Sequence, residues 1–231
     1  MAKASDGTIV SKQDTFLPSF SMSASTTKIL SATFSSQDSS KIAFVTSEGS
    51  LQGLFGGHLV IINMMTKSAE KVYKEPFLSD AGVSFNTNDS MICTGNSNGD
   101  VIVRNLLNPE GNPLDKQLNV DVPHESGISE VVLQHFQSQS HSDRCAVTQA
   151  KFSIVKRHIL ASSYKNGHIV IWDTTDIFKK VQTKGVSQAC KKYVFQSHEG
   201  RVCTGICFSQ VNHLLLSSCG VDGRIYFYDI T

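Results

Sequence analysis

A turn followed by an apolar strand recurs along this chain, and it limits the folds that the chain can adopt. The clearest copy spans residues 161–173, where small residues lead into Asn166-Gly167 and an apolar run ends at Trp172-Asp173. Asn-Gly favours a tight hairpin because both residue types tolerate positive φ. Residues 169–172 are β-branched or aromatic and consecutively apolar, which is typical of a strand buried on both faces. The pattern therefore predicts a β-hairpin whose second strand lies between two layers.

The same pattern returns around a series of glycines that mark the predicted turns: Gly7, Gly57, Gly99, Gly167 and Gly223. Upstream of most of these turns, a predicted strand ends in phenylalanine and a polar residue, at Phe34-Ser35, Phe85-Asn86, Phe152-Ser153 and Phe208-Ser209. The shortest spacing, from Gly57 to Gly99, fits a repeat of about 40–45 residues, and the longer spacings require insertions.

The stretch from His198 to Asp229 carries a more specific signal. It contains His198, Phe208-Ser209, Ser217-Ser218, Asp222-Gly223 and Tyr228-Asp229 in that order. This order resembles a WD repeat, and the third copy adds a literal Trp172-Asp173. WD repeats build β-propellers with one four-stranded blade per repeat. The resemblance, which covers about residues 28–231, implies an all-β fold: a WD-repeat β-propeller.

The repeats predict about four full blades plus a half blade. The predicted blades are residues 28–75, 76–123, 146–195 and 198–231, with a partial blade and loop at 1–27 and an irregular insertion at about 124–145. Within that insertion, residues 127–136 are expected to form one or two helical turns. These blades fall short of the usual seven-bladed ring, so we expect an incomplete propeller that continues in a longer natural protein. Closure as a four- or five-bladed ring is the alternative.

A narrower resemblance covers the last two copies, over roughly 80 residues. The residues that carry it include Ala150-Lys151-Phe152-Ser153, Ile171-Trp172-Asp173, Gly205-Ile206-Cys207-Phe208-Ser209 and Arg224-Ile225. They are similar to the propeller of the GCP-WD family, the adaptors of the γ-tubulin ring complex. In that family the propeller is the targeting part, and a helical C-terminal tail engages the γ-tubulin complex.

The narrower resemblance implies a non-catalytic protein–protein interaction scaffold that targets microtubule nucleation to the centrosome or spindle, with centrosomal or spindle proteins as partners. A generic WD-repeat scaffold, such as a substrate receptor in ubiquitin ligation, is the alternative, because fold alone does not separate these functions.

His198, Ser218 and Asp222 allow a third hypothesis, a serine hydrolase, because a Ser-His-Asp set can activate a nucleophile. No G-x-S-x-G motif surrounds Ser218. The WD resemblance instead implies a buried structural network, in which Tyr228 takes the place of the tryptophan. In the third copy the corresponding residues are Ser163, Asn166 and Trp172. We therefore expect no catalytic residues and no enzyme activity.

Residues beside the turn and the loop histidine line the partner-binding face of WD propellers. By this resemblance the candidate partner-binding residues are Lys165, Glu199, Arg201 and Val221. A run without acids between Ile177 and Phe195 holds five lysines, and it could dock an acidic surface. We favour the alternative that these lysines protect an outer strand from edge-to-edge pairing.

Composition excludes several other classes. The net charge of +1 argues against nucleic acid or anionic membranes as partners. No apolar run is long enough to span a bilayer, and no signal peptide pattern opens the chain, so a cytoplasmic location is expected. The six cysteines include no C-x-x-C pair, which predicts reduced thiols and no metal site. No phosphate-binding loop follows Gly53–Gly57, so no cofactor or small-molecule substrate is expected.

Overall fold

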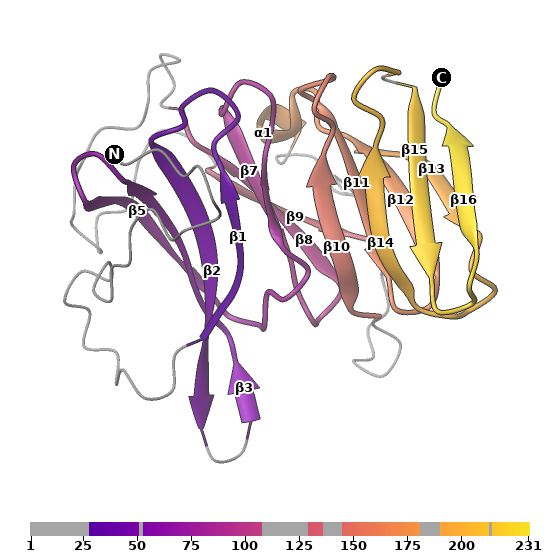
Figure 1. Cartoon of the computed structure of the whole chain (residues 1–231), viewed down its shortest axis with the longest axis horizontal. Coiled ribbons are helices and arrows are strands. Elements are labelled where there is room, and N and C mark those ends of the chain that lie inside the picture. Colours follow the sequence, from indigo (N-terminus) through magenta and orange to yellow (C-terminus); the bar gives the residue numbers. More distant parts are fainter. Residues whose placement is uncertain (1–27, 51–52, 108–128, 136–144, 181–189, 213) are drawn as a thin grey trace, which may run out of the picture.

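The computed structural model describes residues 28–50, 53–107, 129–135, 145–180, 190–212 and 214–231. These residues form four antiparallel sheets that stand side by side in a row (Figure 1). In each sheet, strands that follow one another in sequence also pair with one another. The described part of the chain is therefore all-β, as predicted, apart from the single helical turn α1 (Ile177–Lys180).

Each sheet is built from one stretch of the chain. Sheet 1 contains β1 (Lys28–Phe34), β2 (Lys41–Ser50), β4 (Gly57–Asn63) and β5 (Ser68–Glu75), and β3 (Gly53–Phe55) pairs with the end of β2. Sheet 2 contains β6 (Val83–Phe85), β7 (Met91–Gly95), β8 (Asp100–Asn105) and β9 (Glu130–Gln134). Sheet 3 contains β10 (Val147–Phe152), β11 (Ile159–Tyr164), β12 (His168–Asp173) and β13 (Lys191–Gln196). Sheet 4 contains β14 (Cys203–Phe208), β15 (Leu215–Gly220) and β16 (Ile225–Asp229).

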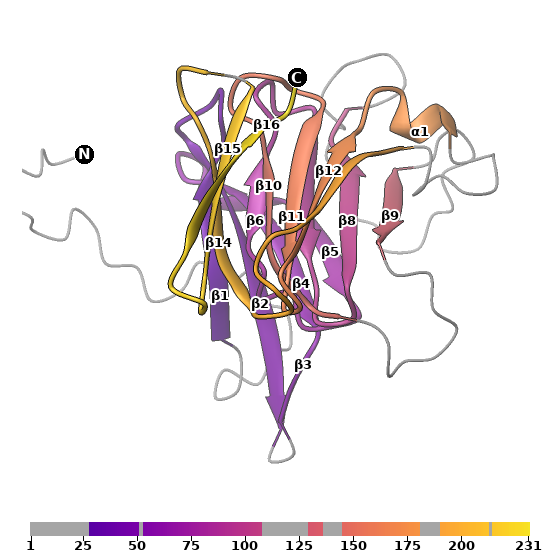
Figure 2. The same ribbon diagram turned by 90° about the vertical axis from the view of Figure 1, so that its right-hand side faces the viewer.

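The first strands of successive sheets meet. β1 contacts β6, β6 contacts β10, and β10 contacts β14. Hydrogen bonds reinforce the middle junction, where Ala150 N–H donates to Ala81 O (3.2 Å) and Phe152 N–H donates to Ser84 Oγ (3.1 Å). Viewed along the row, the sheets lie one behind another (Figure 2). Stacked sheets whose first strands meet are the arrangement of propeller blades around a common axis.

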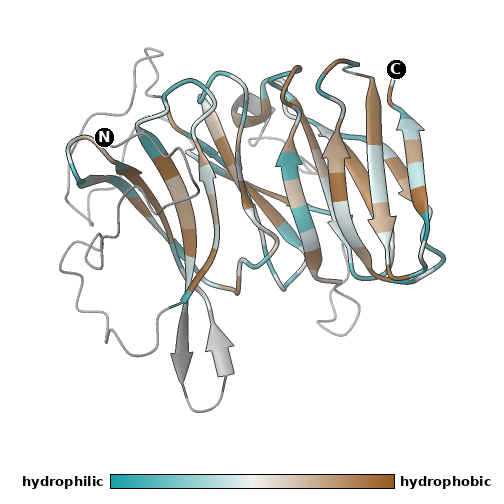
Figure 3. Cartoon of the chain, in the orientation of Figure 1, coloured by the Kyte–Doolittle hydropathy of each residue, from teal (hydrophilic) through white to brown (hydrophobic). Residues whose placement is uncertain are grey.

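Hydrophobic cores fill the spaces between neighbouring sheets. Along β12, Ile169 and Ile171 pack with Leu216 in the core between sheets 3 and 4. Val170 and Trp172 belong to the opposite core, between sheets 2 and 3. All four β12 side chains are completely buried, which confirms that this strand lies between two layers. Figure 3 shows hydrophobic segments on strands of all four sheets.

Three of the predicted turns have nearly the same geometry. Gly99, Gly167 and Gly223 have positive φ, and each is the last residue of its turn. The N–H of each glycine closes the turn by donating to a carbonyl oxygen three residues earlier, as in Gly167 N–H to Tyr164 O (3.0 Å). The preceding Asn or Asp has negative φ, so these hairpins combine an ordinary turn with a left-handed glycine. Gly57 does not end a turn; it begins β4. The turns lie along one edge of the row, the lower edge in Figure 1, which we call the turn edge.

One part of the predicted organisation is wrong. Residues 130–134, which we expected in a helical part of the insertion at 124–145, form strand β9 and pair with β8. The reason is the period-2 alternation in this segment: Val131 and Leu133 are buried, while Glu130 and Val132 face outward. β9 therefore supplies the outer strand of sheet 2.

The described sheets do not close into a ring. Sheets 1 and 4 lie at opposite ends of the row (Figure 1). Within the described part of the chain, β16 pairs only with β15. The described blades therefore form an open arc, as expected for an incomplete propeller, and not a four-bladed ring. The partial blade predicted at 1–27 lies outside the described residues.

Candidate functional site

Sheet 4 brings together the four side chains of the network predicted from the sequence. His198 lies in the loop before β14, Ser218 on β15, Asp222 in the turn and Tyr228 on β16. His198 Nδ1 lies 3.0 Å from each carboxylate oxygen of Asp222, and His198 Nε2 lies 2.8 Å from Ser218 Oγ. Ser218 Oγ is 2.7 Å from the Tyr228 hydroxyl. These contacts tie the loop, the turn and two strands into one chain of hydrogen bonds.

The direction of this chain follows from the chemistry of its ends. A carboxylate only accepts hydrogen bonds, so His198 Nδ1–H donates to Asp222. In the neutral imidazole, Nε2 then accepts from the Ser218 hydroxyl, which in turn accepts from Tyr228 O–H. Burial of Asp222 alone would raise its pKa, but hydrogen bonds from His198 and from Arg224 N–H outweigh burial and lower the pKa of this carboxyl.

Gly220 creates the space that His198 occupies. A Cβ at Gly220 would lie 2.5 Å from His198 Nδ1 and 2.9 Å from the Val202 carbonyl oxygen, so a side chain here would force the surrounding atoms to shift. The equivalent residue in sheet 3 is Tyr164. It lies two positions before the turn residue Asn166, just as Gly220 lies two positions before Asp222. Tyr164 is completely buried there, so sheet 3 fills the same place with a ring of its own.

The network of sheet 3 uses a different serine from the predicted one. Trp172 Nε1–H donates to Ser162 Oγ (2.8 Å), and the Ser162 hydroxyl donates to the Tyr164 hydroxyl (3.2 Å). Ser163, which we predicted here, lies 2.8 Å from Thr148 Oγ1 instead. The correction follows from strand alternation, because Ser162 and Trp172 face one side of the sheet and Ser163 faces the other. Asn166 Oδ1 accepts from His168 N–H (3.2 Å) within the turn.

In sheet 2 a buried cluster of charged side chains takes the place of this network. Arg104 occupies the position of Trp172 and Tyr228, and its Nη1 donates to Glu75 Oε1 (2.6 Å). Its Nε donates to Glu130 Oε2 (2.8 Å), and Thr94 Oγ1–H also donates to Glu75 (3.1 Å). Arg104 and Glu75 are almost completely buried, so each needs the other to offset the loss of water.

The partners of Arg104 come from other parts of the chain. Glu75 ends β5 of sheet 1, and Glu130 lies on β9 beyond residues that the structure does not describe. The available sequence signal was Arg104 itself, because an arginine at a position otherwise taken by buried aromatic residues requires an acidic partner. The described residues of sheet 1 form no such network: Ile62 and Phe44 stand at the corresponding positions and pack with Val60.

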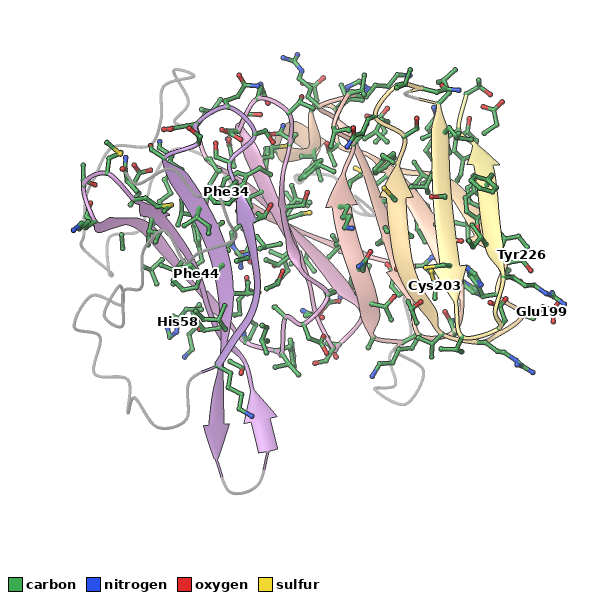
Figure 4. All side chains as sticks on the ribbon, viewed as in Figure 1. Phe34, Phe44, His58, Glu199, Cys203 and Tyr226 are labelled. Carbon is green, nitrogen blue, oxygen red and sulfur yellow. The ribbon has the colours of Figure 1, made fainter. Side chains whose placement is uncertain are left out.

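The four candidate partner-binding residues are exposed at the turn edge. Lys165 and Val221 lie in the turns of sheets 3 and 4, and Glu199 and Arg201 follow His198. Figure 4 shows Glu199 at the lower end of sheet 4, beyond Tyr226. Arg224 Nη1 donates to Glu199 Oε1 (2.6 Å), which forms an ion pair at this corner. The structure places these residues together, and partner binding by them remains a prediction.

The remaining sequence features are distributed as follows. Within the described residues no group of three His, Cys, Asp or Glu side chains is arranged to hold a metal ion. Lys191 and Lys192 lie on β13, the outer strand of sheet 3, while Lys184 lies outside the described residues. In the part of the chain that the structure describes, no helix has the length and apolar character needed to cross a membrane.

Comparisons with known proteins agree with this architecture. The family model for the WD domain, G-beta repeat, matches residues 189–229. A protein chain in the crystal structure of a mitotic checkpoint complex superimposes with a TM-score of 0.57 over 88% of this chain and 50% of that chain, at 15% sequence identity. This structural likeness shows the fold alone.

Curated relatives have sequence similarity over part of their length. Protein NEDD1 from Homo sapiens is 27% identical over 147 residues, which is 64% of this chain and 17% of the human protein. Protein NEDD1 from Mus musculus is 30% identical over 89 residues, and that from Bos taurus is 32% identical over 89 residues. In each of these two the match spans 38% of this chain and 12% of the relative. Residues 189–229 therefore match a WD repeat, and the four described sheets have the fold of β-propeller blades.

Proposed function

We propose that this chain is a non-catalytic protein–protein interaction scaffold that targets a γ-tubulin-complex adaptor to the centrosome or spindle. The observation that carries the proposal is the similarity to Protein NEDD1 over 64% of the chain. NEDD1 is the adaptor GCP-WD. The residues of the last two repeats of this chain resemble the propeller of that family. The matched region covers a small share of NEDD1, so the role proposed here is that of the propeller alone.

The geometry around Ser218 supports a structural role over a catalytic one. Ser218 is 2% exposed and His198 is completely buried. Ser218 Oγ is already engaged by both His198 and Tyr228. A nucleophile must reach an external carbonyl carbon, and this hydroxyl points into the space between sheets. We therefore assign the His198–Ser218–Asp222–Tyr228 chain to blade stability.

The turn edge is the surface that we propose for partner binding. Lys165, Glu199, Arg201 and Val221 are exposed there on two neighbouring blades. Loops held by a rigid scaffold are frequent sites of recognition, because the scaffold fixes their geometry before a partner arrives. Here the hydrogen-bonded network behind the loop provides that rigidity.

Localisation in dividing cells tests the proposal. The chain fused to a fluorescent protein is expressed after depletion of endogenous NEDD1, and the ratio of spindle-pole to cytoplasmic fluorescence is measured in mitosis. We expect enrichment at the poles for the wild-type chain. We expect loss of enrichment for a variant carrying Lys165→Glu, Arg201→Glu and Val221→Asp.

A matched control changes exposed residues on the opposite edge, with Ile154→Ser, Arg157→Glu and Val211→Ser. This control is expected to localise like the wild-type chain. A uniform cytoplasmic distribution of the wild-type chain would overturn the targeting role. Co-purification with a cullin–RING ligase instead of spindle proteins would favour the ubiquitin-ligase alternative.

A further inference from the structure

The turns of sheets 3 and 4 and the loop between them form one continuous surface. A Cβ placed on Gly167 would lie 2.6 Å from the Arg201 carbonyl oxygen, so the turn that carries Lys165 directly abuts the loop that carries Arg201. On the other side, Val221 N–H donates to Val202 O (3.0 Å). Arg201 therefore lies between Lys165 and Val221, and we call these three residues the Lys165–Arg201–Val221 surface.

The acidic groups near this surface are already paired within the blades. Asp222 accepts from His198 (3.0 Å), and Glu199 is bound to Arg224 (2.6 Å). Asp100, in the turn of sheet 2, accepts from Asn98 (2.8 Å) and Gln134 (2.9 Å).

The two cations of this surface differ from these acids in their pairing. Among the described residues, neither Lys165 nor Arg201 has an ion-pair partner, although both are exposed. Among the described residues, the surface therefore presents two exposed cations, whereas the carboxylates of Asp222 and Asp100 are buried and hydrogen-bonded and Glu199 is bound to Arg224.

An apolar side chain accompanies the two cations. Val221 is 60% exposed in the turn of sheet 4, although its backbone is held by Val202. The supporting backbone is also ordered by its own contacts: Arg201 N–H donates to His198 O (2.8 Å), and His198 is fixed by Asp222 and Ser218. Little conformational freedom has to be lost when such a loop binds a partner.

We propose that the Lys165–Arg201–Val221 surface binds a short acidic peptide segment that contains an apolar residue. Two carboxylates of the segment pair with Lys165 and Arg201, and the apolar side chain lies against Val221. A polypeptide fits better than a nucleic acid, because an apolar side chain of a peptide can pack against Val221, whereas a phosphate backbone offers no such group. The inference rests on the proposed interaction role and names the class of partner for that site.

Binding to a defined peptide tests the inference on the whole 231-residue chain. The probe is a fluorescein-labelled ten-residue peptide of glutamates with one central leucine, and fluorescence anisotropy gives its Kd. We expect Lys165→Glu with Arg201→Glu to weaken binding by about tenfold or more at low salt. We expect wild-type binding to weaken as ionic strength rises, because exposed charge pairs are screened.

The matched control reverses two cations at the other end of the same blade, Lys156→Glu with Arg157→Glu. Its Kd should equal that of the wild-type chain, and circular dichroism establishes that both variants are folded. Val221→Ser should reduce the preference for the leucine-containing peptide over an all-glutamate peptide, without affecting the salt dependence.

Several outcomes would overturn the inference. They are equal Kd values for the wild-type chain and the Lys165/Arg201 variant, equal weakening by the Lys156/Arg157 control, or tighter binding of a single-stranded oligonucleotide of the same charge. Failure here remains distinguishable from failure of the proposed function. Localisation at the spindle poles without peptide binding overturns only the inference. Peptide binding without localisation at the poles overturns only the targeting role.

Discussion

At the scale of single residues, strand register decides which of two adjacent serines stabilises a blade. Ser162 shares a face with Trp172, and Ser163 lies on the other face beside Thr148. Sheet 4 has the same register, with Ser218 two residues beyond the partner of Tyr228. The serine that binds the aromatic residue is therefore set by its position in the ladder, and a neighbouring serine of identical chemistry cannot substitute for it.

Replacement of the two serines tests this assignment. Ser162→Ala removes the acceptor of Trp172 Nε1–H in a fully buried place, so we expect a loss of about 1–3 kcal/mol in the free energy of unfolding. Ser163→Ala should cost less, about 1 kcal/mol or below, because the Thr148 hydroxyl is partly exposed and can bind water. Urea denaturation of the two variants measures both values. A larger loss for Ser163→Ala would contradict the register.

At the scale of elements, equivalent strands in neighbouring blades have opposite environments. Ile171 on β12 pairs with Ala161, and Phe227 on β16 pairs with Ser217 at the same register position. Ile171 is fully buried under sheet 4, whereas Phe227 is 70% exposed. The difference arises because sheet 4 covers one face of sheet 3, while no described sheet covers the corresponding face of sheet 4.

This difference predicts an inverted order of mutational costs. Ile171→Ala should lower the free energy of unfolding by about 2–5 kcal/mol, because it opens a cavity between two sheets. Phe227→Ala removes a larger side chain but should cost less than about 1 kcal/mol, since most of that side chain is already in water. Denaturation of both variants under the same conditions gives the comparison. A cost for Phe227→Ala equal to that for Ile171→Ala would mean that this face is covered.

At the scale of the whole molecule, blades are held together by polar contacts as well as by apolar cores. His135 follows β9 in sheet 2 and His168 begins β12 in sheet 3, with His135 Nε2 and His168 Nδ1 2.9 Å apart. One nitrogen must donate and the other accept, so two protonated rings cannot form this contact. Burial, then the charges of Lys191 and His168, lowers the pKa of His135 to about 4.

The junction between sheets 2 and 3 should therefore weaken in acid. The pKa of His135 falls from an ordinary value of 6.5 to about 4 on folding, so the unfolded chain binds the proton more readily between these values. Stability is retained above about pH 6.5 and is lost as the pH falls towards about 4. Asp222 does not contribute to the pH dependence of stability in this window. The pKa of its carboxyl is lowered from the usual value of 3.8, so this group takes up protons only at lower pH.

Thermal unfolding between pH 7 and 5 measures the effect. The wild-type Tm should fall across this range, and His135→Gln should reduce the slope, because glutamine can still donate and accept but does not titrate. His168 retains part of the dependence, since burial lowers its pKa as well. Identical slopes for the wild-type chain and the variant would assign the pH dependence to other groups.

Much of the architecture follows from local patterns in the sequence. Short apolar runs with left-handed glycines at Gly99, Gly167 and Gly223 identified the hairpins, because turn geometry is decided by a few adjacent residues. The consecutive apolar residues of β12 indicated burial on both faces, and Trp172 is fully buried. His198, Ser218, Asp222 and Tyr228 could be grouped in advance, since all four belong to one repeat with recognisable spacing.

Other features depend on contacts between distant segments, and no local pattern contains them. Arg104 lies between Glu75 of one sheet and Glu130 of a strand that we had expected to be helical, so this buried charge cluster exists only after the blades have stacked. The choice of Ser162 over Ser163 required the pairing register of β11 with β12. A sequence of repeats specifies what each blade is made of, whereas burial and charge pairing between blades arise from how the blades are placed against one another.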